Sequence, residues 1–167
     1  MDRYNIQLVG WFIFITLLLF LSRVVPHPPN FTPIIAVAAF WPTVSRTWYI
    51  SLCCCLLAMF LGDLYFGLHS YMIWTYGSLA IISLLRFHYF INGVLGSVIF
   101  YALTNFGVWT SGYYGYTVEG LIACYIAAIP FFTNTIISTV FFILVFNLLN
   151  TGVQRWEAHN GKTSSRL

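Results

Sequence analysis

Residues 6–33 read IQLVGWFIFITLLLFLSRVVPHPPNFTP, an apolar run that ends abruptly at a proline-rich joint. About 20 predominantly apolar residues are enough for an α-helix to cross the hydrocarbon core of a bilayer. Proline lacks a backbone N–H and pushes the preceding residue out of the helical conformation, so a helix must end near Pro26. The stretch therefore predicts a spanning helix at 6–25. No small-residue cleavage site follows this helix, so we expect it to be retained rather than removed as a signal peptide.

The same alternation of apolar run and short polar joint continues to the end of the chain. The pattern predicts further helices at 33–41, 47–61, 72–85 and 91–106, then a short helix at 118–129 and a last span at 134–149, separated by Pro130. We therefore expect an all-α integral membrane protein with six transmembrane helices and a short extra helix before the last span. Residues 1–149 would form a single transmembrane domain, and 150–167 a polar, flexible cytoplasmic tail.

Two of these helices carry small residues that favour close packing. The run at 33–41 is short for a full crossing, so it either lies deep in the bundle or continues through Pro42 with a kink. Its three alanines, at 36, 38 and 39, would let it approach neighbouring helices closely. Gly93 and Ser97 lie one turn apart in the helix at 91–106 and predict a second close contact.

The composition excludes a soluble domain. Of 167 residues, 60% are hydrophobic, 20% aromatic and only 7% charged, whereas a soluble domain carries about 25% charged residues. So few charges cannot cover a surface that faces water, but an apolar exterior suits helices that face lipid. The net charge of +3 forms no basic patch, so we expect no nucleic-acid partner.

The positive charges predict the orientation of the helices. With six crossings, six of the seven basic residues fall on one side, namely Arg3, Arg46, Arg86, Arg155, Lys162 and Arg166. Basic joints remain in the cytoplasm, so this side and both chain ends are expected there. The first, third and fifth joints then share the outer face.

Asp63 and Glu119 are the only acids outside the chain ends, and each falls at the outer end of a predicted helix. An ionised acid at the bilayer centre costs about 2.5–3.5 kcal/mol on insertion scales. We expect both acids to line an outward-facing cavity together with Arg23. The alternative is that each is a hydrated acid at a helix end, where Glu119 would gain from the helix dipole.

The outer joints also carry histidines and aromatic residues. No H-x-x-H or H-E-x-x-H spacing includes His27 or His69, so we predict no protein-built metal site. Each is either a loop histidine or a single axial contact to a metal already held in a ligand. Trp109 and the three tyrosines that follow it are typical of an aromatic belt, and would alternatively form a stacking lid over a flat ligand. Asn105 would hydrogen-bond a ligand or a neighbouring helix.

The remaining residue types predict no enzyme activity. The four cysteines, at 53, 54, 55 and 124, form no C-x-x-C pair and are expected to be buried, inert thiols. The chain has no G-x-S-x-G, no glycine-rich phosphate loop and no ATP-binding element. We therefore expect neither a catalytic residue nor a cofactor, and energy for transport would come from another subunit or from a gradient.

Four segments carry a resemblance to known proteins. They are PHPPNFTP at 26–33, GLHS at 67–70, TNFGVW at 104–109, and EGLIACY at 119–125 continuing to IPFF at 129–132. They resemble an uncharacterised family of small bacterial membrane proteins. That family in turn resembles the substrate-binding (S) components of energy-coupling-factor (ECF) vitamin transporters, nearest the solitary cobalamin type.

The resemblance implies a six-helix S-component-like bundle in the bacterial inner (cytoplasmic) membrane, with a vitamin-sized pocket under joints one, three and five. The chain departs from these transporters at two points. No cysteine lies in an outer joint to meet the cobalt of a corrinoid, and His69 is the nearest substitute by position. The first helix also lacks the alanine-x-x-x-alanine seam with which S components dock their membrane partner.

We therefore expect the chain to capture and translocate a small organic, vitamin-like nutrient, with a corrinoid as one candidate. The ligand-binding residues would be Asp63, His69, Asn105, Trp109 and Glu119 in the outer pocket, with His27 and Asn30 in the first lid joint. Expected partners are membrane lipid, the ligand and other membrane subunits. The alternative is a non-catalytic accessory subunit of a larger membrane complex. A third class, a membrane thiol or haem enzyme, would depend on the cysteines at 53–55.

Overall fold

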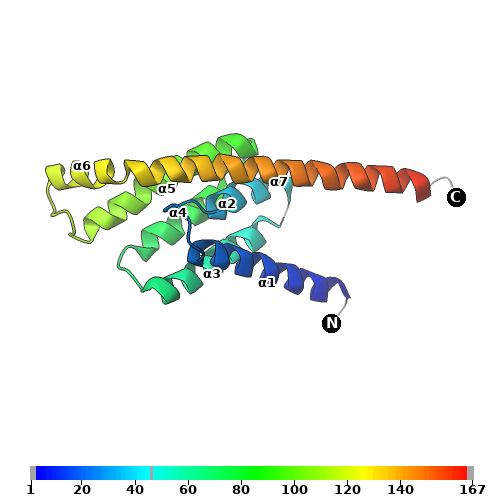
Figure 1. The fold of residues 1–167 in the computed structure, drawn as a ribbon, viewed down its shortest axis with the longest axis horizontal. Coiled ribbons are helices and arrows are strands. Elements are labelled where there is room, and N and C mark those ends of the chain that lie inside the picture. Colours follow the sequence, from blue (N-terminus) through cyan, green and yellow to red (C-terminus); the bar gives the residue numbers. More distant parts are fainter. Residues whose placement is uncertain (1–2, 46, 165–167) are drawn as a thin grey trace.

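The computed structural model describes the backbone of residues 3–45 and 47–164 and the side chains of 9–45 and 47–160, and this part of the chain contains seven helices and no strand. In chain order they are α1 (Arg3–Val24), α2 (Ile34–Val44), α3 (Trp48–Phe66), α4 (Met72–Leu84), α5 (Tyr89–Thr110), α6 (Val118–Ala127) and α7 (Ile129–Ser164) (Figure 1). The all-α prediction is confirmed for these residues.

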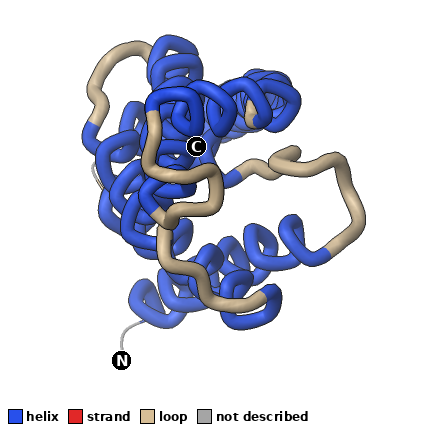
Figure 2. The backbone as a smooth tube through the Cα atoms, turned by 90° about the vertical axis from the view of Figure 1, so that its left-hand side faces the viewer, coloured by secondary structure: helices blue, strands red, loops and turns tan. Residues whose placement is uncertain are grey.

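Successive helices run back and forth along the long axis of the molecule. The joints 25–33, 67–71 and 111–117 lie toward one end, which we call the loop end, and both chain ends lie toward the other (Figure 1). Seen from the loop end, loop segments cross in front of the helices (Figure 2). The first, third and fifth joints therefore share one end of the bundle, as the charge pattern predicts. The side chains of Arg3, Arg46, Lys162 and Arg166 lie outside the described residues.

Three helices are long and apolar enough to cross a membrane: α3, α5 and the Ile129–Asn160 part of α7. The helices α2, α4 and α6 and the Val9–Val24 part of α1 are apolar but shorter. Large apolar side chains cover the outside, among them Ile73, 76% exposed, and Trp11, 64% exposed. An exterior of this kind belongs in lipid, and the structure is consistent with a membrane protein.

The short helix α2 lies at the centre of the bundle, where it packs against α3, α4, α5 and α7. Three of its alanines, at 36, 38 and 39, are fully buried, so its neighbours approach its backbone closely. The helix continues through Pro42 to Val44. The segment therefore both lies deep in the bundle and continues through Pro42, because a proline in the last turn does not prevent a helix from lying in the core.

Small residues also make the contacts of α5. A side chain at Gly93 would run into Ile143 of α7, and the hydroxyl of Ser97 donates to that of Thr139 at 3.2 Å. Gly93 and Ser97 are both buried, so the predicted close contact is confirmed. Farther along α5, Gly107 gives room to the indole of Trp74 on α4.

Several helices end later than predicted. We expected α3 to end at residue 61, α5 at 106 and the last helix at 149, but they end at 66, 110 and 164. A polar residue does not end a helix unless it caps the helix or is followed by a proline. No cap and no proline occurs at the predicted ends, residues 61, 106 and 149. The end of α3 is set by Gly67, whose φ of 111° only glycine adopts readily. The described part of the polar segment 150–167 is consequently helical.

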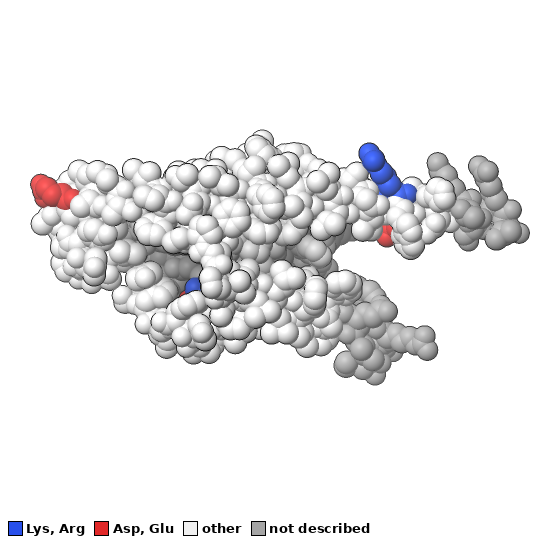
Figure 3. All heavy atoms as spheres, in the orientation of Figure 1, with Lys and Arg blue, Asp and Glu red and all other residues white. Residues whose placement is uncertain are grey.

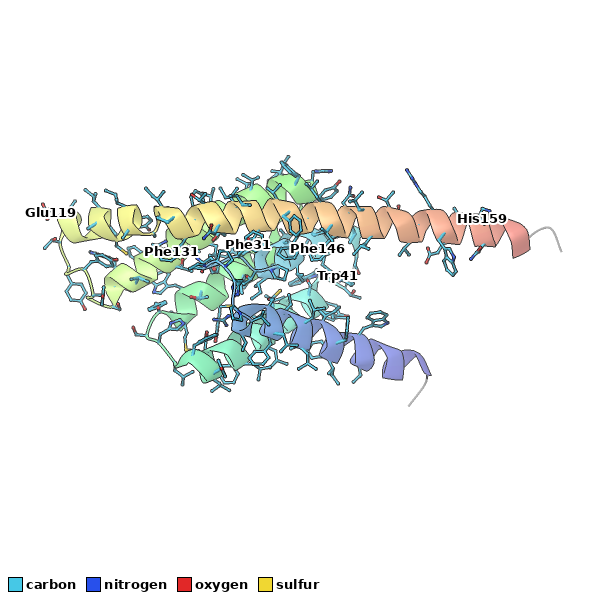
Figure 4. All side chains as sticks on the ribbon, viewed as in Figure 1. Phe31, Trp41, Glu119, Phe131, Phe146 and His159 are labelled. Atoms are coloured by element: carbon cyan, nitrogen blue, oxygen red, sulfur yellow. The ribbon has the colours of Figure 1, made fainter. Side chains whose placement is uncertain are left out.

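The predicted break between the last two helices is present, but it falls at Ala128 rather than at Pro130, and the last helix begins at Ile129 rather than at 134. Pro130 therefore occupies the first turn of α7. A missing N–H costs nothing there, because first-turn N–H groups have no partner within the helix. The two helices run almost in line, from Glu119 at one extreme to His159 near the other (Figure 4).

The cysteines are free thiols in helices, and three of the four are buried. Cys54 and Cys55 lie in the core, where their sulfurs lie 3.8 and 3.6 Å from the carbonyl oxygens of Phe12 and Ile34. The prediction of burial was wrong for Cys53, which faces outward. The period of an α-helix turns neighbouring residues by about 100°, so three consecutive cysteines cannot all face the core.

Gly107→Ala should loosen the packing of α4 on α5. A Cβ at this position would lie 2.5–2.9 Å from three atoms of Trp74, and one of these is the Trp74 Cβ, which cannot move aside without its backbone. We expect a loss of about 1–3 kcal/mol in stability. Gly77→Ala in α4 is the matched control, because nothing lies within 4 Å of its added methyl group. Thermal unfolding in detergent measures both, and equal melting temperatures would contradict the prediction.

Candidate functional site

A cavity of about 520 Å³ opens at the loop end, and all three joints contribute to its wall. A hollow is visible on the face drawn in Figure 3, with basic atoms inside it. The polar residues around the cavity are Arg23, Asn30, Asp63, His69, Tyr71, Thr75, Tyr101, Thr104, Asn105, Tyr114 and Thr135. A second cavity of about 250 Å³ shares Arg23 and Asn30 with the first.

An ion pair forms one side of the main cavity. Arg23 Nη2 lies 2.9 Å from Asp63 Oδ1, and Arg23 Nη1 donates to the carbonyl oxygen of Met59 at 2.6 Å. The hydroxyl of Tyr76 donates to Asp63 Oδ2 at 2.6 Å. The carboxylate is only 2% exposed, and it is balanced by one cation and one further hydrogen bond. A buried charge is stable when it is paired and hydrogen-bonded in this way.

The local sequence makes room for this pair. Arg23 lies in the last turn of α1, where the helix dipole favours a cation. Asp63 lies in the last turn of α3, and the preceding Gly62 has no side chain to obstruct the guanidinium of Arg23. The prediction of a loop at 62–69 was wrong for Asp63, because the helix continues past it. The acid is neither in a loop nor hydrated at a helix end.

His69 extends the polar cluster into the cavity. Its Nε2 lies 3.7 Å from Asp63 Oδ2, and its ring stacks on Tyr71 with 3.9 Å between centroids. Its Nδ1 is buried and has no hydrogen-bond partner among the described residues. A buried ring nitrogen without a partner costs free energy unless water or a ligand satisfies it.

The proline-rich joint 25–33 reaches across the loop end to α7. Asn134 Nδ2 donates to the carbonyl oxygen of Pro29 at 3.0 Å, and the hydroxyl of Ser138 donates to that of Asn30 at 3.4 Å. Asn30 adopts φ 63°, a left-handed conformation that asparagine tolerates better than most residues. Phe31 packs against Phe141 and Phe142 of α7 (Figure 4). Few and weak polar contacts therefore hold this joint in place.

The helices α5 and α7 supply most of the aromatic wall, with Phe100 and Tyr101 from α5 and Phe131 and Phe132 from α7. The hydroxyls of Tyr101 and of Tyr125 on α6 each donate at 2.6 Å to a carbonyl oxygen of the other's helix. The ring of Tyr101 also lies 4.5 Å from that of Phe132, between centroids. These contacts hold broad, flat apolar surfaces against the cavity.

Four of the seven predicted site residues line the main cavity: Asn30, Asp63, His69 and Asn105. His27 lines the smaller cavity, and its Nδ1 lies 2.5 Å from the carbonyl oxygen of Val25. The structure does not bring Trp109 or Glu119 to either cavity.

Helix continuation explains the position of Trp109 but not that of Glu119, because α6 begins at Val118 as predicted. Trp109 is in the extended last turns of α5, and its indole N–H donates to the carbonyl oxygen of Thr117 at 3.2 Å. Glu119 is fully exposed at the start of α6, where Thr117 caps the helix by accepting from the N–H of Gly120. Hydrogen bonds from its own N–H and from the Thr117 hydroxyl lower the pKa of Glu119, so it remains ionised.

Tyr76 is the site residue that the sequence analysis missed. A carboxylate in an apolar environment needs donors as well as a cation, and a tyrosine in the apolar helix that follows Asp63 is a donor of this kind. The other donor, Arg23, was predicted. Among residues 9–45 and 47–160, no three His, Cys, Asp or Glu side chains are grouped so that they could hold a metal ion.

Asp63→Ala should destabilise the protein by about 3–5 kcal/mol, because it leaves the guanidinium of Arg23 half-buried and without its counter-ion. Replacing both partners, as Arg23→Met with Asp63→Leu, should recover most of this loss. Glu119→Gln removes an exposed acid and should leave the melting temperature unchanged. Thermal unfolding of Asp63→Leu, of Arg23→Met and of the variant with both changes completes a double-mutant cycle that measures the coupling, and additive losses would show that the pair contributes nothing.

Comparison with known proteins places the chain in a family without assigning an activity. No curated protein matches it, and no solved structure matches it. The sequence model of one family, described as a family of unknown function, covers residues 4–158, which is nearly the whole chain. The chain therefore belongs to the family of unknown function DUF6580.

Proposed function

We propose that the chain captures a small organic nutrient at the outer face of the bacterial cytoplasmic membrane and releases it inward, in the manner of an S component. The main support is the cavity at the loop end, to which all three joints of that end contribute. Its volume of about 520 Å³ lies within the range of about 300–1,000 Å³ that is typical of small-molecule sites. A few polar groups among aromatic walls are also typical of such sites.

The volume of the cavity favours a nutrient smaller than a corrinoid. A corrinoid has several times as many heavy atoms as the drug-sized molecules that cavities of this volume enclose. No cysteine lies in the outer joints to meet a corrinoid metal. His69 is already engaged by Tyr71 and Asp63. The likeness to ECF S components therefore remains a prediction about architecture, and the ligand need not be the one that the cobalamin type binds.

Six crossings with both chain ends in the cytoplasm are part of this proposal. The helices α1 to α5 and α7 would be the spans, and α6 would lie at the outer end in line with α7. At 36 residues α7 is about 54 Å long, so it would extend beyond the hydrocarbon core of about 30 Å. Its basic end, which includes Arg155, would then project into the cytoplasm.

One observation favours the accessory-subunit alternative. The end of α7 projects beyond the rest of the bundle (Figure 1), and it carries two exposed apolar side chains, Val153 and Trp156. These side chains are three residues apart and share one face of the helix, which would suit a partner chain. Stoichiometric co-purification of another membrane protein would support this second function.

Native mass spectrometry of the gently solubilised full chain tests capture. The wild type should retain a small molecule, and His69→Ala should reduce the retained fraction about three- to tenfold, because one hydrogen bond and one stacking surface are lost. His159→Ala is the matched control at the far end of α7 and should retain the molecule fully. Equal retention by both variants would remove His69 from the site.

Reporter fusions at the two chain ends test the orientation. We expect both reporters to be active only as cytoplasmic fusions, because six crossings return the chain to the side on which it began. Reporters that place the two ends in different compartments would contradict the six-crossing proposal.

A further inference from the structure

Four of the six hydroxyl groups that line the main cavity donate their hydrogens to backbone carbonyl oxygens, namely those of Thr75, Tyr101, Thr104 and Thr135. The other two are the hydroxyls of Tyr71 and Tyr114. Thr104 donates to the carbonyl oxygen of Phe100 at 2.7 Å, and Thr135 donates to that of Phe131 at 2.8 Å. Tyr101 donates across to α6. Each of these oxygens keeps lone pairs that can accept a hydrogen bond, but it has no hydrogen left to donate.

The amide of Asn105 offers the cavity an acceptor and one remaining hydrogen, because its Nδ2 uses only one of its two hydrogens. Its Nδ2 donates to the carbonyl oxygen of Tyr101 at 2.7 Å, and no protein donor reaches its Oδ1 among the described residues. Asp63 also presents only acceptors. The polar part of this wall is therefore rich in acceptors, and buried acceptors are normally satisfied by a partner that brings hydrogens.

The charge of the cavity is balanced before any ligand enters. Among the described residues, Arg23 is the only lysine or arginine that lines it, and Asp63 is the only acid. These two neutralise each other at 2.9 Å. An anionic ligand would have to compete with Asp63 for the guanidinium of Arg23. A cationic ligand would have to compete with Arg23 for the carboxylate of Asp63. The remaining titratable groups at the cavity are His69, Cys124 and three tyrosines.

The apolar walls favour a flat molecule. The rings of Tyr101 and Phe132 lie 4.5 Å apart at an angle of 35°, and those of His69 and Tyr71 are stacked. Aromatic rings present broad surfaces on which another ring can stack or pack edge-on.

We propose that the ligand is an uncharged, flat heterocycle that carries several N–H or O–H donors. Its donors would meet the acceptors of Thr104, Asn105 and Thr135, and its ring would lie against the aromatic wall. This inference rests on the proposed capture function and specifies the chemical class of the nutrient. On this proposal the ligand is recognised by the hydrogen-bond acceptors of the cavity wall and not by the positive charge of Arg23.

Two ring series test the class by isothermal titration of the solubilised full chain. Uracil and lumazine are uncharged rings with N–H donors, their N-methylated derivatives lack those donors, and their ring carboxylates add a negative charge. In at least one series the unmethylated ring should bind about tenfold tighter than its N-methylated derivative and than its carboxylate, because about two hydrogen bonds are lost or one charge is left unpaired.

A pair of variants in α5 locates the effect. Thr104→Val removes one acceptor at nearly constant shape and should weaken binding of the unmethylated ring about three- to tenfold. It should leave binding of the N-methylated ring unchanged. Thr110→Val is the matched control, because Thr110 makes the same kind of bond, to the carbonyl oxygen of Gly107 at 2.8 Å, outside the cavity.

Two results would overturn the proposal. Tighter binding of the carboxylates would show that Arg23 selects an anion, and the capture function would stand with a different ligand class. The absence of a preference for the unmethylated ring in both series would show that the acceptors do not select the ligand. Loss of the proposed function itself has a different signature, because the wild type would then retain no small molecule in native mass spectrometry.

Discussion

The ion pair between Arg23 and Asp63 is the contact on which the loop end depends. Each group alone would be a charge in apolar surroundings, and such a charge is stable only when a partner is held beside it. The pair and the hydroxyl of Tyr76 therefore fix the register of α1, α3 and α4 at one level. These helices otherwise meet through apolar contacts, and apolar contacts tolerate sliding and rotation better than a charge pair does.

The same arrangement shapes the cavity. The charges of Arg23 and Asp63 already balance each other, so the cavity does not attract a ligand of opposite charge. Hydrogen bonding and shape are then left to select a ligand. The joint 25–33 is attached to α7 by two side-chain hydrogen bonds. One of them is weak, because its donor and acceptor are 3.4 Å apart. The proposed capture function would require this joint to open without disturbing the helices, and its few polar contacts to α7 suit that requirement.

Helix existence could be predicted here, and helix ends could not. Apolar runs with a proline at either side are a strong local signal, and each predicted helix is present. Ends depend on caps and on neighbours, so α3 and α5 continue past Gly62 and Gly107, where close packing rather than a turn requires glycine. Those extra turns placed Asp63 inside a helix and turned Trp109 away from the cavity. The prediction that Asn30, Asp63, His69 and Asn105 meet at one end rested on charge and joint order, which the longer helices leave unchanged.

The sequence by itself determined that this chain is helical, that it suits lipid and that its odd-numbered joints lie together. The reason is that apolar length, proline and the distribution of arginine and lysine act locally or through the membrane, without reference to a particular fold. Only the tertiary structure decided that Arg23 pairs with Asp63 through space, that Tyr76 completes the pair, and that most of the hydroxyl hydrogens around the cavity are already used. Those facts depend on distances and angles between helices, and side-chain packing sets these only when the bundle is assembled.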